Sequence, residues 1–424
     1  MNLKNKIFNN KILIYFLFYL SLLLSYFVNE DLLGGARADY TYHLRFIHGF
    51  NENFSYTFKY FGSTEKNLNT RNLPTFFIII SFLINYLDLE LIRLLNMFAS
   101  IGISYIFYKC LCITFLKINK IDLFIISLFV FLSPTIRSLS IWPYTLIWGL
   151  LAFLISIYYY LKFIKSSKKN YKYAIYNSIF LVISSYIYPS FAVFILYFFY
   201  NYIKCIKEKK KIINLILINI ILGLPAIYFV VTHKLYFLEA EGVALNKNEL
   251  YNPFNKILLI STIIFYYIIP IINFKSLLKN FKYNISLKVF IITLILSLII
   301  TSLFNYSTIN YFGGGFFFKL SHFIIQNNSL TYFIFIISLL VFYNYSFFRK
   351  NNLILIICLI LFNTQYTIYH KYFDPLIIII AFLLINSNLL TEFFKRKNFI
   401  IKFYFFIFFY YLIALISKKF IYTI

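Results

Sequence analysis

The sequence predicts an all-α, polytopic transmembrane protein, and two observations carry that prediction. Hydrophobic residues fill 61% of the 424 positions and charged residues only 13%, which excludes a water-soluble fold. The runs without charge are repeatedly long enough for a bilayer span of about 20 residues. These runs are continuous and do not alternate apolar with polar residues, so they favour helices over transmembrane β-strands.

The formal net charge of +26 does not indicate a nucleic-acid partner. The lysines fall in short clusters between apolar runs, where the positive-inside rule places orientation signals for membrane helices. Lys4, Lys6 and Lys11 precede the first run, so we expect a cytoplasmic N-terminus. The four cysteines have no metal-ligand spacing, and they indicate neither a zinc site nor a disulfide.

The first span is expected at 13–28, and residues 29–90 then form an extracytoplasmic loop. Within this loop the apolar stretch 74–87 has only about 14 residues, too few for a span. Lysines that follow the run 91–115 mark the end of that run as cytoplasmic, so 74–87 is expected to be a juxtamembrane helix along the outer surface.

The same logic continues to the C-terminus and predicts about 13 spans in a single membrane domain, 1–424. The loop 29–90 is its expected catalytic region, and 91–424 supplies the remaining transmembrane helices. The expected spans lie near 13–28, 91–115, 121–134, 145–161, 172–188, 190–203, 212–231, 257–274, 287–304, 330–347, 352–365, 375–390 and 399–416.

Arginines indicate where an anion would bind, because this lysine-rich chain uses few of them. A guanidinium group suits phosphate or carboxylate, and lipid headgroups are the alternative ligand. The arginines expected on the outer face are Arg37, Arg45, Arg71, Arg93 and Arg137.

A turn at Gly34 and Gly35 leads into a predicted helix that carries Asp39 in its first turn. Asp39 and His43 lie four residues apart, with Phe46 following at i+7, so a carboxylate and an imidazole share one helical face at the bilayer edge. Alternatively, Asp39 only favours the start of the helix by interacting with the helix dipole.

Several short motifs occur in a characteristic order and on the expected outer face. They are Asp39-Tyr40, an amphipathic helix at 40–50, Asn72-Leu73-Pro74-Thr75-Phe76, Glu90-Leu91-Ile92-Arg93, Ser133-Pro134 with Arg137, and His370-Lys371-Tyr372-Phe373-Asp374-Pro375. Together they resemble the GT-C class of integral membrane glycosyltransferases, which includes the aminoarabinose transferases and the protein O-mannosyltransferases. We expect no large C-terminal soluble domain, unlike in some members.

The resemblance implies an inverting transferase of the bacterial cytoplasmic (inner) membrane that acts in cell-envelope glycan or glycolipid synthesis. Its donor would be a polyprenyl-phosphate-linked sugar and its acceptor a lipid or glycan, with membrane lipids around both. Asp39 would be the catalytic general base. The implied substrate-binding residues are Tyr40, His43, Arg93, Arg137, His370, Lys371 and Tyr372. Lys371 is alternatively a lysine at a helix end that extends toward water.

The chain departs from the family pattern after Ser133-Pro134, where many members carry a second acidic residue. This chain has Trp142-Pro143-Tyr144 there, and a tyrosine does not replace a carboxylate as metal ligand or base. The departure argues against a divalent metal, and no other cofactor is indicated.

Two other functions remain open. A lipid-linked saccharide flippase or transporter would carry ionisable groups inside its spans, whereas the charges here collect at one interface. A polysaccharide polymerase or ligase would share the outer working face. It usually has arginines in a large late outer loop, and residues 305–329 contain none.

Overall fold

The computed structural model describes residues 11–32, 35–63, 66–166, 169–232, 252–284, 287–307, 313–363, 365 and 367–421. The described residues form helices and no strands, which confirms the all-α prediction. The chain divides into two compact units. Unit 1 comprises Met1–Leu238 and Tyr404–Ile424, and unit 2 comprises Glu239–Phe403. Lys4 and Lys6, on which the predicted orientation partly rests, lie outside the described residues.

Unit 1 contains most of the long helices, and the last helix enters it from unit 2. Its elements are α2 (Lys11–Phe27), α3 (Ala36–Glu52), α4 (Phe54–Tyr60), α5 (Thr75–Leu83), α6 (Leu89–Thr114), α7 (Lys120–Ser127), η1 (Leu128–Leu132), α8 (Pro134–Ile141), α9 (Thr145–Lys165), α10 (Tyr171–Ile187), η2 (Pro189–Phe194), α11 (Ile195–Cys205), α12 (Lys209–Thr232) and α21 (Phe399–Ile421).

Unit 2 consists of shorter helices. They are α13 (Pro253–Ile268), α14 (Phe274–Asn284), α15 (Leu287–Ser302), α16 (Gly315–Ile325), α17 (Ser329–Asn344), α18 (Lys350–Phe362), η5 (His370–Tyr372), α19 (Leu376–Leu383) and α20 (Leu389–Lys395).

Four described helices are long and apolar enough to cross a membrane: α6, α9, α12 and the part of α21 up to Ile416. A fifth span results if Lys120–Leu132 and Pro134–Ile141, which meet at 63°, are taken as one broken span. The predicted count of 13 is not confirmed. Most of the other predicted spans coincide with apolar helices of 10–17 residues, which are shorter than a straight span of about 20 residues.

Side-chain caps set where several unit 1 helices begin, because the first amide groups of a helix lack partners within it. Asp88 accepts from the Leu91 N–H at 2.6 Å and starts α6. Ser133 accepts from the Ile136 N–H at 3.1 Å, and Pro134 occupies the first turn of α8. The break between η1 and α8 therefore follows from local sequence.

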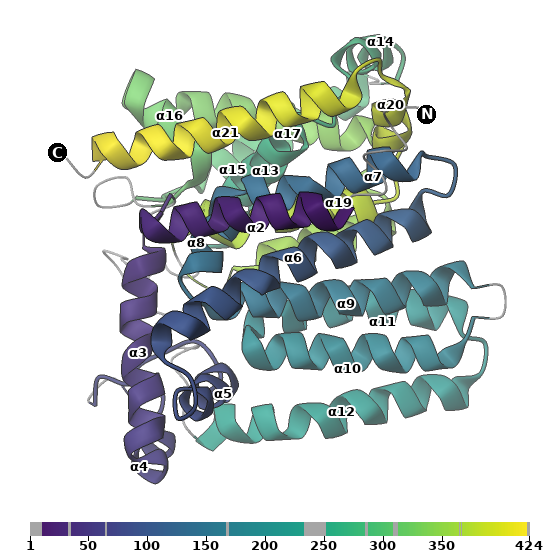
Figure 1. The fold of residues 1–424 in the computed structure, drawn as a ribbon. Coiled ribbons are helices and arrows are strands. Elements are labelled where there is room, and N and C mark those ends of the chain that lie inside the picture. Colours follow the sequence, from purple (N-terminus) through teal and green to yellow (C-terminus); the bar gives the residue numbers. More distant parts are fainter. Residues whose placement is uncertain are drawn as a thin grey trace, which may run out of the picture. The chain divides into compact units, whose positions relative to one another are not determined.

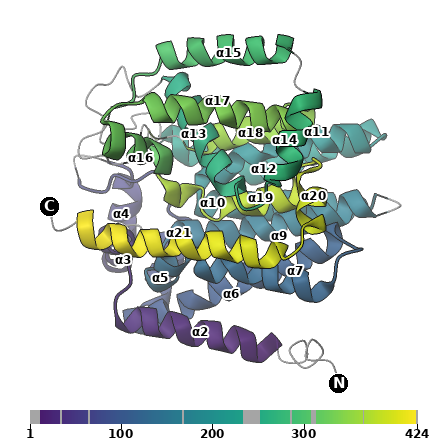
Figure 2. The same ribbon diagram turned by 90° about the horizontal axis from the view of Figure 1, so that it is seen from above.

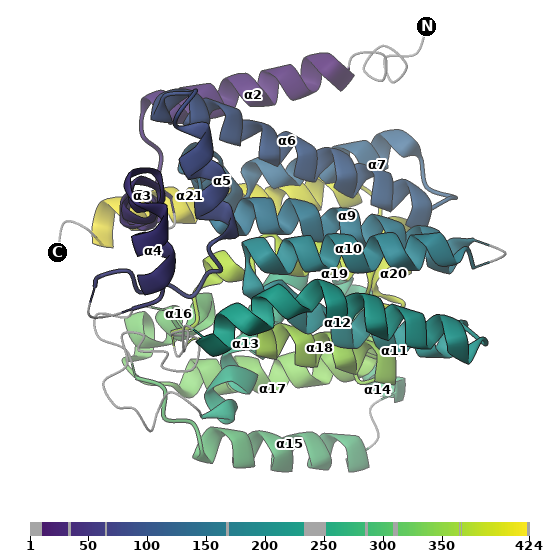
Figure 3. The same ribbon diagram turned by 90° about the horizontal axis from the view of Figure 1, so that it is seen from below.

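Polar side chains tie the spans of unit 1 together. Asn177 of α10 donates to the carbonyl and the hydroxyl of Ser156 on α9 at 2.9 and 2.7 Å, and it accepts from the Tyr202 hydroxyl of α11 at 2.8 Å. Figure 3 shows α9, α10 and α12 side by side. Because apolar helix surfaces contact lipid as favourably as they contact other helices, buried hydrogen bonds of this kind help to hold membrane helices together.

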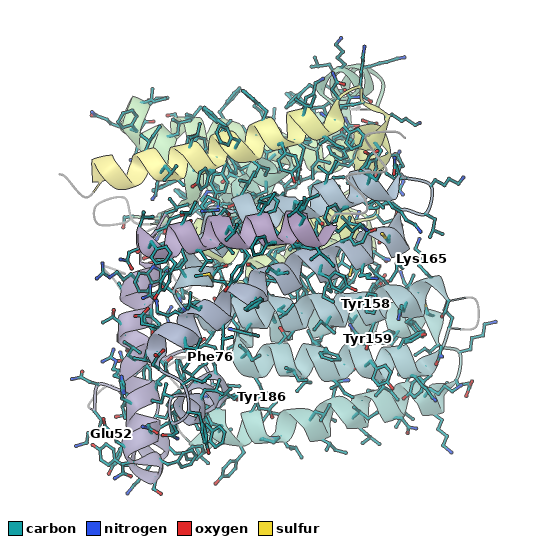
Figure 4. The ribbon with its side chains drawn as sticks, viewed as in Figure 1. Glu52, Phe76, Tyr158, Tyr159, Lys165 and Tyr186 are labelled. Carbon is teal, nitrogen blue, oxygen red and sulfur yellow. The ribbon has the colours of Figure 1, made fainter. Side chains whose placement is uncertain are left out.

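The helix α12 contains Pro225, and a neighbouring tyrosine hydrogen-bonds to its backbone beside this residue. The Tyr186 hydroxyl of α10, labelled in Figure 4, donates to the Leu222 carbonyl at 2.8 Å and accepts from the Ala226 N–H at 3.2 Å. Because proline disturbs the local hydrogen-bond ladder, Tyr186 satisfies two backbone groups there.

Helix surfaces are apolar outward and contain small polar residues inward. In α15 the buried residues are Thr293 and Ser297, whereas large aliphatic side chains such as Ile295 and Leu298 are exposed. Figure 2 shows α15 running beside α17, with its other side uncovered by unit 2. Such a distribution is expected for helices surrounded by lipid.

The segment α3–α5 lies across one end of the unit 1 spans, with α3 nearly perpendicular to α9 and α10 (Figure 1). Its core is an aromatic cluster to which α3 contributes Phe46 and Phe50, α5 contributes Phe76 and Phe77, and the end of α12 contributes Phe229. Figure 4 labels Phe76 within this group and Glu52 at the end of α3. The predicted helices at 40–50 and after Pro74 are both present.

Lysines concentrate at the opposite end of the unit 1 spans. The 21 residues of α9 extend about 30 Å, so Lys165 lies far from the α3–α5 segment (Figure 4). The short links α6–α7, α9–α10 and α11–α12 all turn at that end. The lysines there are Lys109, Lys117, Lys120, Lys162, Lys165, Lys169, Lys172, Lys204, Lys207, Lys209, Lys210 and Lys211, whereas the α3–α5 segment carries Lys59 and Lys66.

Candidate functional site

The helix α3 begins at a tight turn that an acidic side chain stabilises. Gly35 has a φ of 96°, a left-handed conformation that glycine adopts without strain. The Asp31 carboxylate accepts from the N–H groups of Ala36 and Arg37 at 3.2 and 3.4 Å. Two of the first amide groups of α3 are therefore satisfied by Asp31. The predicted turn into a helix is observed at Gly35, and Gly34 lies outside the described residues.

The inner face of α3 carries Tyr40 and His43, which are 6% and 5% exposed. The His43 ring stacks on Tyr144 with centroids 4.9 Å apart and planes 6° from parallel, and it meets the edge of Phe77 at 4.9 Å. Asp39 is half-buried beside this face. The carboxylate and the imidazole thus occur on one helix, as the spacing predicts, with the imidazole deeper.

Tyr144 lies in the segment where the sequence analysis expects no second acid. Its ring is buried and supports His43, so this position contributes an aromatic platform and no carboxylate. Within the described residues, no three His, Cys, Asp or Glu side chains come close enough together to hold a metal ion.

Arg93 of α6 is enclosed next to α3. Its Nη1 donates to both Glu90 oxygens at 3.0 and 2.9 Å, its Nε to the Ile141 carbonyl at 3.3 Å, and its Nη2 to Asn29 Oδ1 at 3.4 Å. The guanidinium carbon lies 4.0 Å from the centroid of a Trp142 ring. Arg93 is therefore paired and almost fully covered, whereas the Glu90 side chain is 59% exposed.

Arg137 of α8 forms a buried ion pair with Glu30, which follows α2. Its Nε and Nη2 donate to the two carboxylate oxygens at 2.7 and 2.9 Å. Its remaining donors reach the Phe131 carbonyl at 3.3 Å and the hydroxyl of Ser25. Arg137 therefore joins α2 and the residues that follow it to η1 and α8.

Trp142 stands where α3, α6 and α8 meet. Its indole N–H donates to the Glu30 carbonyl at 3.1 Å, and its ring faces Arg93, Tyr40 at 5.8 Å and Arg37 at 5.6 Å. The sequence analysis did not select Glu30 or Trp142 as site residues. The only signal in the sequence was that Trp142 is one of two tryptophans in the chain.

Burial raises the pKa of Tyr40 to about 12, with Arg93 opposing the shift and Glu90 adding to it. The phenol is therefore protonated at neutral pH and is available as a hydrogen-bond donor. Its hydroxyl makes no hydrogen bond to any residue that the structure describes.

The remaining predicted site residues belong to unit 2. His370 Nε2 accepts from the Phe316 N–H of α16 at 2.5 Å, so the ring proton lies on Nδ1, which is 3.0 Å from the Tyr267 hydroxyl. Burial, with a contribution from Lys319, lowers the pKa of His370 to about 3. His370 is thus a neutral residue that joins α13 to the start of α16.

Lys371 and Tyr372 follow in the same 3₁₀ turn. The Tyr372 hydroxyl donates to Gln365 Oε1 at 3.1 Å, and the Lys371 ammonium lies 5.4 Å from the Tyr369 ring. The other predicted site residues lie in unit 1, where Tyr40 and Arg93 both contact Trp142, Arg137 pairs with Glu30, and Asp39 and His43 share α3 with Tyr40.

Comparison with known proteins found no matching protein-family model, no matching curated protein and no matching solved structure.

Proposed function

We propose that this chain is a membrane glycosyltransferase that transfers a sugar from a polyprenyl-phosphate-linked donor to a lipid or glycan acceptor on the extracytoplasmic face. One observation carries the proposal. The segment with Asp39, Tyr40 and His43 folds across the lysine-poor end of the unit 1 spans and packs against Arg93 and Trp142. By the positive-inside rule that end is the outer one.

Asp39 is the general base of this proposal because its carboxylate is half-buried on α3, close to the bilayer edge where a lipid-linked substrate and water meet. The acceptor hydroxyl gives its proton to Asp39 and forms a new bond to the anomeric carbon. The bond from that carbon to the phosphate oxygen breaks, and polyprenyl phosphate leaves with the electron pair. Attack from the opposite face inverts the anomeric centre.

His43 and Tyr40 supply hydrogen-bonding groups beside Asp39. Arg93 makes no direct contact with the departing phosphate in this proposal, because its donors already bind Glu90, Asn29 and the Ile141 carbonyl. Arg137 is removed from the substrate contacts of the proposal because Glu30 already takes two of its donors. His370 is removed because both of its nitrogens are engaged within unit 2.

The test is sugar transfer by the purified full chain in proteoliposomes with a polyprenyl-phosphate-linked sugar. Asp39→Asn keeps the side-chain size and removes the base, so transfer should fall by at least a factor of about 100 while the melting temperature is unchanged. Asp31→Asn is the matched control, since Asp31 accepts only backbone amides of α3 in the described contacts. Full activity of the Asp39→Asn protein would remove Asp39 from the mechanism.

Transport of a lipid-linked saccharide is the second candidate, and the broken span Lys120–Ile141 favours it because transporters use interrupted helices at their binding sites. Against it, the charge near this break, Arg137, is paired with Glu30 and held by backbone oxygen. Movement of labelled lipid-linked saccharide between leaflets, undiminished in Asp39→Asn, would favour transport over transfer.

A further inference from the structure

Two of the arginines near Trp142 already have carboxylate partners, and a third does not. Arg93 is paired with Glu90 and Arg137 with Glu30. Arg37 of α3 is exposed, and its guanidinium makes no hydrogen bond or ion pair with any residue that the structure describes. The guanidinium carbon of Arg37 lies 5.6 Å from the centroid of the Trp142 ring. Arg37 is therefore the cation at this junction whose donors are available to a ligand.

Tyr40 adds a second available donor next to Arg37. The two residues are separated by three positions in α3, so they lie on the same side of the helix. The Tyr40 ring is 5.8 Å from Trp142, and its phenol stays protonated because burial raises its pKa. A guanidinium fork and a neutral hydroxyl thus converge around one indole ring.

Three of the carboxylates near this junction already have partners, and Asp39, two positions after Arg37, does not lie on the same side of α3. The Glu30 and Glu90 carboxylates are each bonded to an arginine, and Asp31 accepts the first amide groups of α3. Because Asp31 already caps the amino end of α3, the positive charge for an anion comes from the Arg37 side chain. Trp142 excludes water from one side, which strengthens hydrogen bonds to a charged ligand.

We propose that Arg37, Tyr40 and Trp142 form a binding site for a phosphate group carried by a membrane lipid. Arg37 donates two hydrogen bonds to phosphate oxygens, as its planar fork allows, and Tyr40 donates a third. This inference rests on the proposed function where it identifies that lipid as the polyprenyl-phosphate donor or product. The phosphate chemistry itself also fits a phospholipid headgroup, so the experiment must separate the two sources.

The fluorescence of Trp142 can report ligand binding at this site once Trp148, the other tryptophan of the chain, is replaced. The Trp148 indole N–H donates to Asn96 Oδ1 at 2.7 Å, and Trp148 does not contact Arg37 in the described structure. Full-length Trp148→Phe protein in maltoside detergent would be titrated with a polyprenyl monophosphate, with phosphatidylglycerol and with inorganic phosphate. We expect saturable change of Trp142 fluorescence with the polyprenyl monophosphate and at least about tenfold weaker binding of the other two.

In the same background, Arg37→Gln should weaken polyprenyl monophosphate binding about tenfold and Tyr40→Phe about threefold. Arg37→Lys should restore part of the affinity, because it keeps the charge and loses the fork. Arg45→Gln is the matched control. Arg45 lies on α3 as well, but it stacks on Tyr42 at 3.2 Å, and its loss should leave binding unchanged.

Equal affinities of the parent and Arg37→Gln proteins would overturn the site, even if Asp39→Asn abolishes sugar transfer and the proposed function stands. Equal binding of phosphatidylglycerol and polyprenyl monophosphate would overturn the assignment of the lipid. Arg37-dependent binding by a protein that transfers no sugar would support the site and contradict the proposed function.

Discussion

Arg137 and Glu30 form a two-point ion pair in which both side chains are less than 10% exposed. The pair joins residues 107 positions apart and connects the residues that follow α2 to α8. Because two buried charges stabilise a fold only while both are present, this contact has direct consequences for mutants.

Glu30→Ala should destabilise the protein by about 3–5 kcal/mol, because it leaves the Arg137 guanidinium buried without its carboxylate. Unfolding in mixed detergent micelles followed by circular dichroism measures this loss. Glu208→Ala is the control: the Glu208 side chain is 65% exposed and its partner Lys211 is 41% exposed, so water surrounds both charges and the expected loss is at most about 1 kcal/mol. Equal losses in the two variants would contradict a structural role for the buried pair.

Stability should depend on pH through His370. Its pKa is lowered to about 3 in the folded protein, whereas an unfolded histidine has a pKa of about 6.5. The unfolded state therefore binds the proton first. The contribution of His370 is fully present above about pH 6.5 and decreases as the pH falls toward 3, by up to about 1.4 kcal/mol per pH unit.

Thermal unfolding between pH 7 and 4 would check this dependence. His370→Gln should be less stable at pH 7, because it loses the bonds to Phe316 and Tyr267, and its curve against pH should be flatter. Parallel curves for the parent and the variant would show that His370 does not titrate in this range.

The glycines before α16 should not tolerate a side chain. Gly313 has a φ of 79°, and an added Cβ would lie 2.7 Å from both Thr367 Cγ2 and the Tyr306 hydroxyl. Gly313→Ala should therefore cost at least about 1–3 kcal/mol. In α12 an added Cβ at Gly223 meets nothing within 4 Å, so Gly223→Ala should be neutral or stabilise by up to about 1 kcal/mol. The melting temperature of Gly313→Ala should fall, and that of Gly223→Ala should stay the same or rise.

Tyr186→Phe should weaken the contact between α10 and α12. The change removes hydrogen bonds to two backbone groups beside Pro225, and we expect a loss of about 1 kcal/mol. Tyr228→Phe is the control, since Tyr228 lies on the exposed side of α12 and is 68% exposed. Detergent-induced unfolding of both variants gives the comparison, and an unaffected Tyr186→Phe protein would contradict the role given to the hydroxyl.

Chemical labelling should place α3 and the lysine-rich end on opposite sides of the membrane. In a background without the four native cysteines, Ala38→Cys in α3 should react with an impermeant maleimide from outside intact cells. Ser166→Cys, directly after α9, should react only after the membrane is opened. Labelling of position 38 from the cytosol alone would overturn the proposed function.

Most helices could be predicted from the sequence, because long apolar runs and their flanking lysines are local features. The expected spans 145–161 and 212–231, for example, lie within α9 and α12. The number of spans could not be predicted in the same way. The apolar pattern of α15 and α17 resembles that of a span, yet each has 16 residues, fewer than the roughly 20 residues of a straight span, and hydropathy alone does not fix where a helix ends.

The candidate site was predictable in part. Local spacing was enough to place Asp39 and His43 on one helix, since their separation of four residues is close to one helical turn. Local spacing did not show which of the three arginines, Arg37, Arg93 and Arg137, is paired with a carboxylate. The partner of Arg137, for example, is remote in sequence. The prediction that Arg137 contacts substrate was made without knowledge of its pairing with Glu30.

By itself, the sequence determined the helical class, the positions of most helices and the asymmetry of charge between the two ends of the unit 1 spans. Each of these depends on neighbouring residues and on whether they are excluded from the bilayer or attracted to it. Only the tertiary structure decided which charges are neutralised and which remain available. Electrostatic pairing falls off over a few ångströms, and residues at that distance, such as Glu30 and Arg137 or Arg37 and Trp142, come from segments more than 100 positions apart.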